Sequence, residues 1–158
     1  MSSRVNSKKI RVGLLLLAVV GLFANVPIAA AQSLDFEFFR ARVEPILLKR
    51  RGDRARCYSC HAGANNALNL AALSPGSSSF NEEQSRKNFQ TISRLVVPGK
   101  PIESRFLTHP LAPEAGGDPR PTGMHMGGRQ FETQDDPDWK TWAEWVQGAK
   151  AGGSPRGY

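Results

Sequence analysis

The segment Cys57-Tyr58-Ser59-Cys60-His61 contains both cysteines of this 158-residue chain. On an α-helix, residues three and four positions apart share a face, so the two thiols and the imidazole project to one side. Tyr58 and Ser59 then point elsewhere. The sequence therefore predicts one functional face, made by Cys57, Cys60 and His61.

The C-x-x-C-H spacing is typical of covalent attachment of c-type haem. Two thiols one helical turn apart can bond the two vinyl groups along one haem edge, and the adjacent His61 then binds the iron from the proximal side. A thiol redox pair is the first alternative, but it needs a βαβ pattern that the sequence lacks. A zinc site is the second alternative, and the motif supplies at most three of its ligands.

The first 31 residues have the layout of a secretory signal peptide. Basic residues come first, at positions Arg4, Lys8, Lys9 and Arg11. The apolar run 12–23 follows, and the small residues 29–31 precede a cleavage position before Gln32. We expect export to the periplasm, a mature domain over 32–150 and a flexible tail over 151–158. An uncleaved N-terminal anchor is the alternative.

The formal net charge of +7 belongs largely to that leader. Without its four basic residues, 17 of the 21 Lys and Arg remain against 14 Asp and Glu, a net charge of +3. A charge this small gives no reason to expect nucleic-acid binding. The apolar run is short for a membrane span, so no span is expected after cleavage.

Four segments have helical patterns. The first is 33–48, with Ser33 as the N-cap and a kink before Pro45. The second is 81–96, capped by Asn81, and the third is 102–108, which follows Pro101. The last helix is capped by Asp136 and begins with Pro137. No segment has the strong alternating pattern of a strand. The sequence therefore predicts an all-α protein with long irregular loops.

The last helix carries Trp139, Trp142 and Trp145 on one broad face. Large aromatic side chains dominate small cores, so we interpret this face as packing against the first helix. An electron conduit, and an indole N–H that reaches a haem propionate, are the alternatives.

Five basic residues directly precede the cysteine motif: Lys49, Arg50, Arg51, Arg54 and Arg56. They form either a solvated loop or a docking patch for an acidic redox partner. A third option is that one of these arginines pairs with a haem propionate.

The segments after the motif are expected to complete the cofactor site. Leu68, Leu70 and Leu73 should fold back over the porphyrin. A ligating histidine donates its other ring N–H to a carbonyl or carboxylate, and a carbonyl at 74–75 is the expected acceptor. The proline- and glycine-rich loop 111–130 is long enough to be functional, and Met124-His125-Met126 lies at its centre.

Together these residues resemble the single-haem bacterial c-type cytochrome domains of class I, as found in planctomycete and acidobacterial proteins. The likeness spans nearly all of the mature chain. It rests on four features. The first two are Val43-Glu44-Pro45-Ile46-Leu47, which precedes the cysteine motif, and Val96-Val97-Pro98-Gly99-Lys100-Pro101, which is followed by Ser104. The other two are the ligand loop and the aromatic last helix. It implies a small cytochrome c-like fold of three to five helices around one covalent haem c, with His61 as the proximal iron ligand.

The chain departs from that family on the distal side of the haem. Such domains usually present a methionine followed closely by proline, whereas here Met124, His125 and Met126 precede two glycines. These three are the candidate distal ligands, and His109 beside Pro110 is a further one. The choice matters because a methionine ligand raises the reduction potential, while a second histidine generally leaves it lower.

The leading functional hypothesis is a periplasmic monohaem cytochrome that carries single electrons between redox partner proteins, and not an enzyme. The alternatives are a haem subunit or sensor of a larger redox complex, and a peroxidase-like haem enzyme. An enzyme of that kind needs an open iron position, and the crowded ligand loop favours the carrier.

Overall fold

The computed structural model describes residues 33–119, 125 and 127–153, which form a helical fold. The predicted signal peptide over 1–31 and residues 154–158 of the predicted tail lie outside them. The helices are, in chain order, α1 (Phe36–Phe38), η1 (Phe39–Val43, π-helical), α2 (Glu44–Leu48), α3 (Cys57–His61), α4 (Glu82–Ser93), η2 (Pro101–Glu103, 3₁₀-helical), α5 (Arg105–Thr108), η3 (Pro113–Ala115, 3₁₀-helical) and α6 (Pro137–Val146). Because these described ranges contain isolated β-bridges but no strand, the predicted all-α class is confirmed for them.

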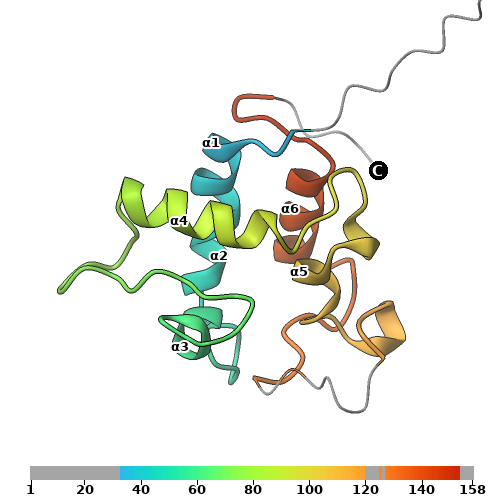
Figure 1. Ribbon diagram of the computed structural model, residues 1–158. Helices are drawn as coiled ribbons and strands as arrows, with labels where there is room; N and C mark the ends of the chain where they lie inside the picture. The colour runs from blue at the N-terminus through green and yellow to red at the C-terminus, as the bar shows by residue number, and fades with distance from the viewer. Residues whose placement is uncertain (1–32, 120–124, 126, 154–158) are drawn as a thin grey trace, which may run out of the picture.

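The helices pack around one core (Figure 1). The continuous segment α1–η1–α2 lies beside α6, and α4 crosses the first of these segments. On α4, the ring of Phe89 makes edge contacts with Phe36, Phe39 and Trp145, which come from the other two segments. No helix in the described part of the chain has the length and apolar character needed to cross a membrane.

The first helical segment begins later than predicted. Asp35 is the N-cap instead of Ser33, and its carboxylate accepts a hydrogen bond of 2.7 Å from Phe38 N. Ser33 accepts hydrogen bonds from the Lys150 ammonium. The predicted break near Pro45 is present as the change from π-helical η1 to α-helical α2, because proline has no N–H with which to continue the ladder.

The middle helices follow the predicted pattern with shorter bounds. Asn81 and Gln84 form a reciprocal capping box at the start of α4, with both hydrogen bonds at 2.9 Å. The helix ends at Ser93, before the predicted end at 96. The predicted helix 102–108 is divided into η2 and α5 by the buried Ser104.

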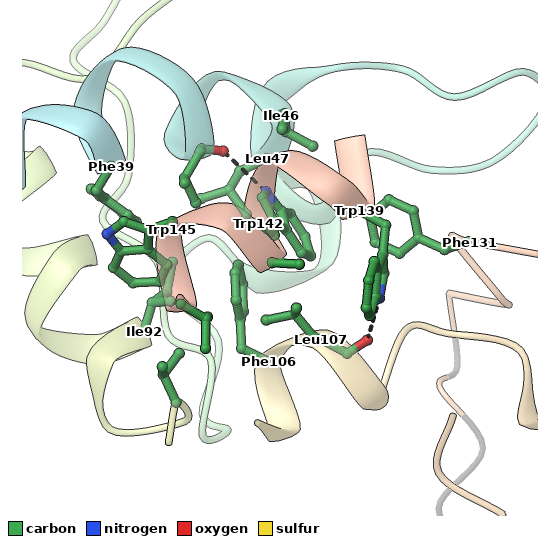
Figure 2. Packing of buried hydrophobic residues seen from close by; sticks show 14 of the residues in the cluster. Phe39, Ile46, Leu47, Ile92, Phe106, Leu107, Phe131, Trp139, Trp142 and Trp145 are labelled. Carbon is green, nitrogen blue, oxygen red and sulfur yellow. Dashed lines mark hydrogen bonds between the residues drawn. The ribbon is translucent and has the colours of Figure 1, made fainter. Parts of the chain in front are cut away.

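The three tryptophans of α6 form the centre of the core (Figure 2). Their exposed fractions are 4% for Trp139, 1% for Trp142 and 0% for Trp145. Every indole N–H donates to a backbone carbonyl, at 3.4 Å to Leu107 O, 3.3 Å to Val43 O and 2.9 Å to Asp35 O, respectively. The packing interpretation is therefore confirmed, and none of these N–H groups is left over for a propionate.

The buried carboxylate of Glu44 joins the first helical segment to α4. This contact was not predicted from the sequence. Glu44 is 4% exposed and accepts hydrogen bonds from Ser85 Oγ at 2.5 Å and from Asn88 Nδ2 at 2.9 Å. Asn88 Oδ1 in turn accepts from Ala71 N at 2.7 Å. Burial raises the pKa of Glu44 above its ordinary value of 4.5, although the two hydrogen bonds and Arg40 oppose this effect.

Replacing this carboxyl should change how stability depends on pH. The folded state holds the Glu44 proton more tightly than the unfolded chain does, so this group's contribution to stability falls as pH rises above 4.5. Glu44→Gln removes that fall. We therefore expect the free energy of unfolding of the variant to increase relative to wild type as pH rises above 4.5, measured by urea titration. Glu83→Gln, which alters an exposed carboxyl on α4, is the control, and a pH-independent difference for Glu44→Gln would contradict the prediction.

The basic segment before α3 is largely paired within the chain. The ion pairs are Lys49 with Asp138, Arg51 with Asp136 and Asp138, and Arg54 with Glu132. Arg51 also lies over the ring of Phe131, and its side chain is only 14% exposed. Arg50 and Arg56 are exposed. Three of the five cations are therefore paired with acidic side chains of the same chain, and the docking patch stays a prediction.

Candidate functional site

The helix α3 presents the cysteine motif as predicted. Cys57, Cys60 and His61 line one cavity of about 360 Å³. Tyr58 points to a different neighbour, because its hydroxyl accepts a hydrogen bond of 3.0 Å from Leu73 N. A helix of five residues is not stable alone, so such contacts are needed to hold it in place.

The remaining walls of the cavity are mostly apolar and come from distant parts of the chain. Their apolar members are Ala67, Leu68, Leu95, Phe106, Pro110 and Trp142. Of the three leucines expected to cover a haem, only Leu68 lines the cavity. Leu70 is instead buried in the core at 1% exposure.

His61 is held by the loop that follows it. Its Nδ1 lies 2.9 Å from Leu68 O and 3.3 Å from Asn66 Oδ1. A carbonyl only accepts, so Nδ1 carries the hydrogen and Nε2 carries the lone pair that a metal ion needs. The prediction of an acceptor at 74–75 is wrong. The loop closes earlier, because Leu70 N donates to His61 O at 2.9 Å.

His125 lines the same cavity. Its ring centroid lies 6.0 Å from that of His61, and the two ring planes differ by 17°. The Nδ1 of His125 lies 2.6 Å from Gly128 O. The other two distal candidates from this loop, Met124 and Met126, lie outside the described residues. Of the three, the structure therefore gives the surroundings of His125.

His109 is the third histidine of the cavity lining. Its ring centroid lies 5.3 Å from that of His125, with the planes at 87°. Its Nδ1 lies 3.5 Å from Asp118 Oδ2. Burial lowers the pKa of His109, the neighbouring His125 lowers it further, and Asp118 opposes both. The ring of His109 therefore makes an edge contact with the ring of His125, and its Nδ1 faces the Asp118 carboxylate.

Both thiols are free, and their surroundings differ. Cys57 is half-buried against the core, whereas Cys60 is exposed. Burial raises the pKa of Cys57 to about 11, so this thiol is protonated at neutral pH. Among the described residues, no three His, Cys, Asp or Glu side chains group into a site for a bare metal ion, and no βαβ unit is formed. The zinc and redox-pair alternatives thus gain no support from this part of the chain.

Among the described residues that line the cavity, Arg105 is the one arginine or lysine, and it was not predicted from the sequence. It is exposed, and its guanidinium forms no hydrogen bond or ion pair with any residue that the structure describes. Its position four residues before His109 is the signal that could have identified it, because residues at this spacing share a helix face.

No protein-family model, no curated protein and no solved structure matches this chain.

Proposed function

We propose that this chain is an exported monohaem c-type cytochrome that carries single electrons between redox partners, with a cytochrome c-like fold. The observation that carries the proposal is the convergence of Cys57, Cys60 and His61 on one apolar cavity. Its volume of about 360 Å³ lies in the ordinary range for ligand pockets, roughly 300–1,000 Å³. Two free thiols beside a histidine that is fixed through Nδ1, within apolar walls, form a donor set that fits haem c.

Cys57 and Cys60 would hold the cofactor covalently. Each thiol adds across one vinyl double bond, so that sulfur bonds one carbon, the thiol hydrogen passes to the other, and no atom leaves. Two neighbouring thiols in an oxidising compartment otherwise form a disulfide, and thioether formation removes that outcome. Residues 1–31 supply the proposed export to the periplasm.

The other lining residues would orient the cofactor and set its surroundings. His61 offers Nε2 to the iron, which supplies one-electron chemistry when bound. Leu68, Leu95 and Phe106 exclude water, and a dry site is one determinant of reduction potential. Arg105 offers a free guanidinium to the haem carboxylates, a role that the sequence had suggested for the basic segment before α3.

Redox partners would approach near the exposed end of the motif. Cys60 is exposed, and the nearby Arg50 and Arg56 are exposed cations. An acidic partner surface would be attracted to this side, and the association rate should fall as salt is added. The partner interaction proposed here therefore depends on two arginines instead of five basic residues.

The visible spectrum of the full chain, expressed in a bacterium that matures c-type cytochromes, tests this function. We expect haem that stays on the polypeptide after denaturation, a six-coordinate low-spin iron and little reaction with carbon monoxide or peroxide. High-spin iron that readily binds either ligand would refute the carrier in favour of a haem enzyme or sensor. A chain without covalent haem would refute all three.

A further inference from the structure

Two histidines of the cavity have the same local arrangement. In each ring, Nδ1 lies at hydrogen-bond distance from a backbone carbonyl, 2.9 Å to Leu68 O for His61 and 2.6 Å to Gly128 O for His125. Each Nδ1 therefore carries the hydrogen, and each Nε2 has its lone pair free. Neither Nε2 has a hydrogen-bond partner among the described residues. This contact is the one that fixes the tautomer of a metal-ligating histidine.

The two rings also have the spacing of ligands that share one metal ion. Their centroids are 6.0 Å apart, and their planes are within 17° of parallel. A metal ion about 2 Å from one nitrogen of each of two opposed imidazoles separates the ring centres by roughly 6 Å. Both rings line the cavity that Cys57 and Cys60 also reach, so this spacing occurs at the proposed haem site.

The backbone after His125 holds this ring in place. Gly128 N donates to His125 O at 2.8 Å, and Gly128 has a φ of +75°, which favours glycine. Gln130 is buried, and its Nε2 donates to Gly127 O at 2.9 Å. A Cβ added at Gly127 would lie 3.2 Å from His125 Cε1 and crowd the ring. The two glycines therefore allow the turn that positions His125.

We infer that His125 Nε2 is the second axial ligand of the haem iron, opposite His61. This inference rests on the function proposed above. The ring of His109 meets that of His125 at 87°, and its Nδ1, 3.5 Å from Asp118 Oδ2, forms no hydrogen bond. His109 therefore lacks both the near-parallel ring orientation and the fixed Nδ1 that His61 and His125 share, and we assign it as the neighbour of the ligand. An iron with two imidazole ligands has a lower reduction potential than one with histidine and methionine in the same surroundings, so the redox partners are low-potential proteins.

The test compares purified holoprotein of wild type, His125→Ala, His125→Met, Met124→Leu and Met126→Leu. Covalent haem is first measured in each by mass under denaturing conditions. We expect His125→Ala alone to change from low-spin to high-spin iron and to bind carbon monoxide readily. His125→Met should remain low-spin, gain the weak far-red band of a thioether–iron bond and have a higher reduction potential than wild type. Its retained spectrum also shows that substitution at this position leaves the fold intact.

The possible failures are distinguishable. Unchanged low-spin iron in His125→Ala, or high-spin iron in Met124→Leu or Met126→Leu, would overturn the assignment of His125 while the covalent haem remains. A wild-type chain that carries no covalent haem would overturn the proposed function itself, and the ligand assignment with it.

Discussion

Replacing Cys57 and Cys60 together by serine is expected to abolish covalent haem attachment. A serine hydroxyl has nearly the shape of a thiol but does not form the thioether. The polypeptide should therefore lose the whole mass of one haem under denaturing conditions, and any pigment should separate from the chain in acidified solvent. Each single variant should keep one thioether and yield less holoprotein. Covalent haem in the double variant would show that the two cysteines are not the attachment site.

A matched control separates loss of attachment from loss of the helix. Ser59→Ala alters an exposed position within α3 that does not line the cavity, so it should retain normal covalent haem. Tyr58 anchors the helix through its hydrogen bond from Leu73 N, and the serine variants leave this contact intact. The apoprotein of the double variant should therefore keep the circular dichroism of a helical chain.

Local rules were sufficient wherever one segment determines its own structure. The side chains of Asn81 and Asp136 cap the helices that follow them, as predicted, because each cap depends only on residues within one turn. The common face of Cys57, Cys60 and His61 follows in the same way from helix geometry. These features needed no information about distant parts of the chain.

The features that could not be predicted are contacts between segments that are far apart in sequence. The pairing of Arg51 depends on Asp136 and Asp138, which lie more than eighty residues later. A local charge pattern cannot show that partner, so the sequence left a solvated loop, a docking patch and a propionate contact open for these cations. The acceptor for His61 was misplaced for a related reason, because the return path of the loop at Leu68 is set by backbone hydrogen bonds and not by residue type.

Trp145→Ala is expected to cause the largest loss of stability among single substitutions in the core. This side chain is fully buried, and its ring lies 5.2 Å from Phe39, 5.9 Å from Phe89 and 6.5 Å from Phe106 between centroids. Truncating a buried tryptophan costs about 3–5 kcal/mol, against a total stability of roughly 5–15 kcal/mol for a typical domain. We expect a corresponding fall in the guanidinium midpoint of the holoprotein. A change of less than about 1 kcal/mol would contradict the central role of this ring.

Trp145→Phe separates packing from hydrogen bonding at the same position. Phenylalanine keeps much of the ring contact but loses the N–H that donates to Asp35 O at 2.9 Å. That carbonyl also accepts from Phe39 N at 3.1 Å, so it is not left without a partner, and the lost bond should cost only about 0.5–1.5 kcal/mol. Ile102→Ala, at a side chain that is 62% exposed, is the control and should change stability by less than about 0.5 kcal/mol.

Trp145 is a better probe of the core than its neighbour Trp142. Trp142 lines the cavity, so its truncation would alter the core and the proposed haem site together, whereas Trp145 does not line it. In the folded fraction of Trp145→Ala, we therefore expect the visible spectrum to remain that of wild type while the unfolding midpoint falls. A spectrum that changes before unfolding begins would mean that the core and the cavity respond as one unit, because α6 carries residues of both.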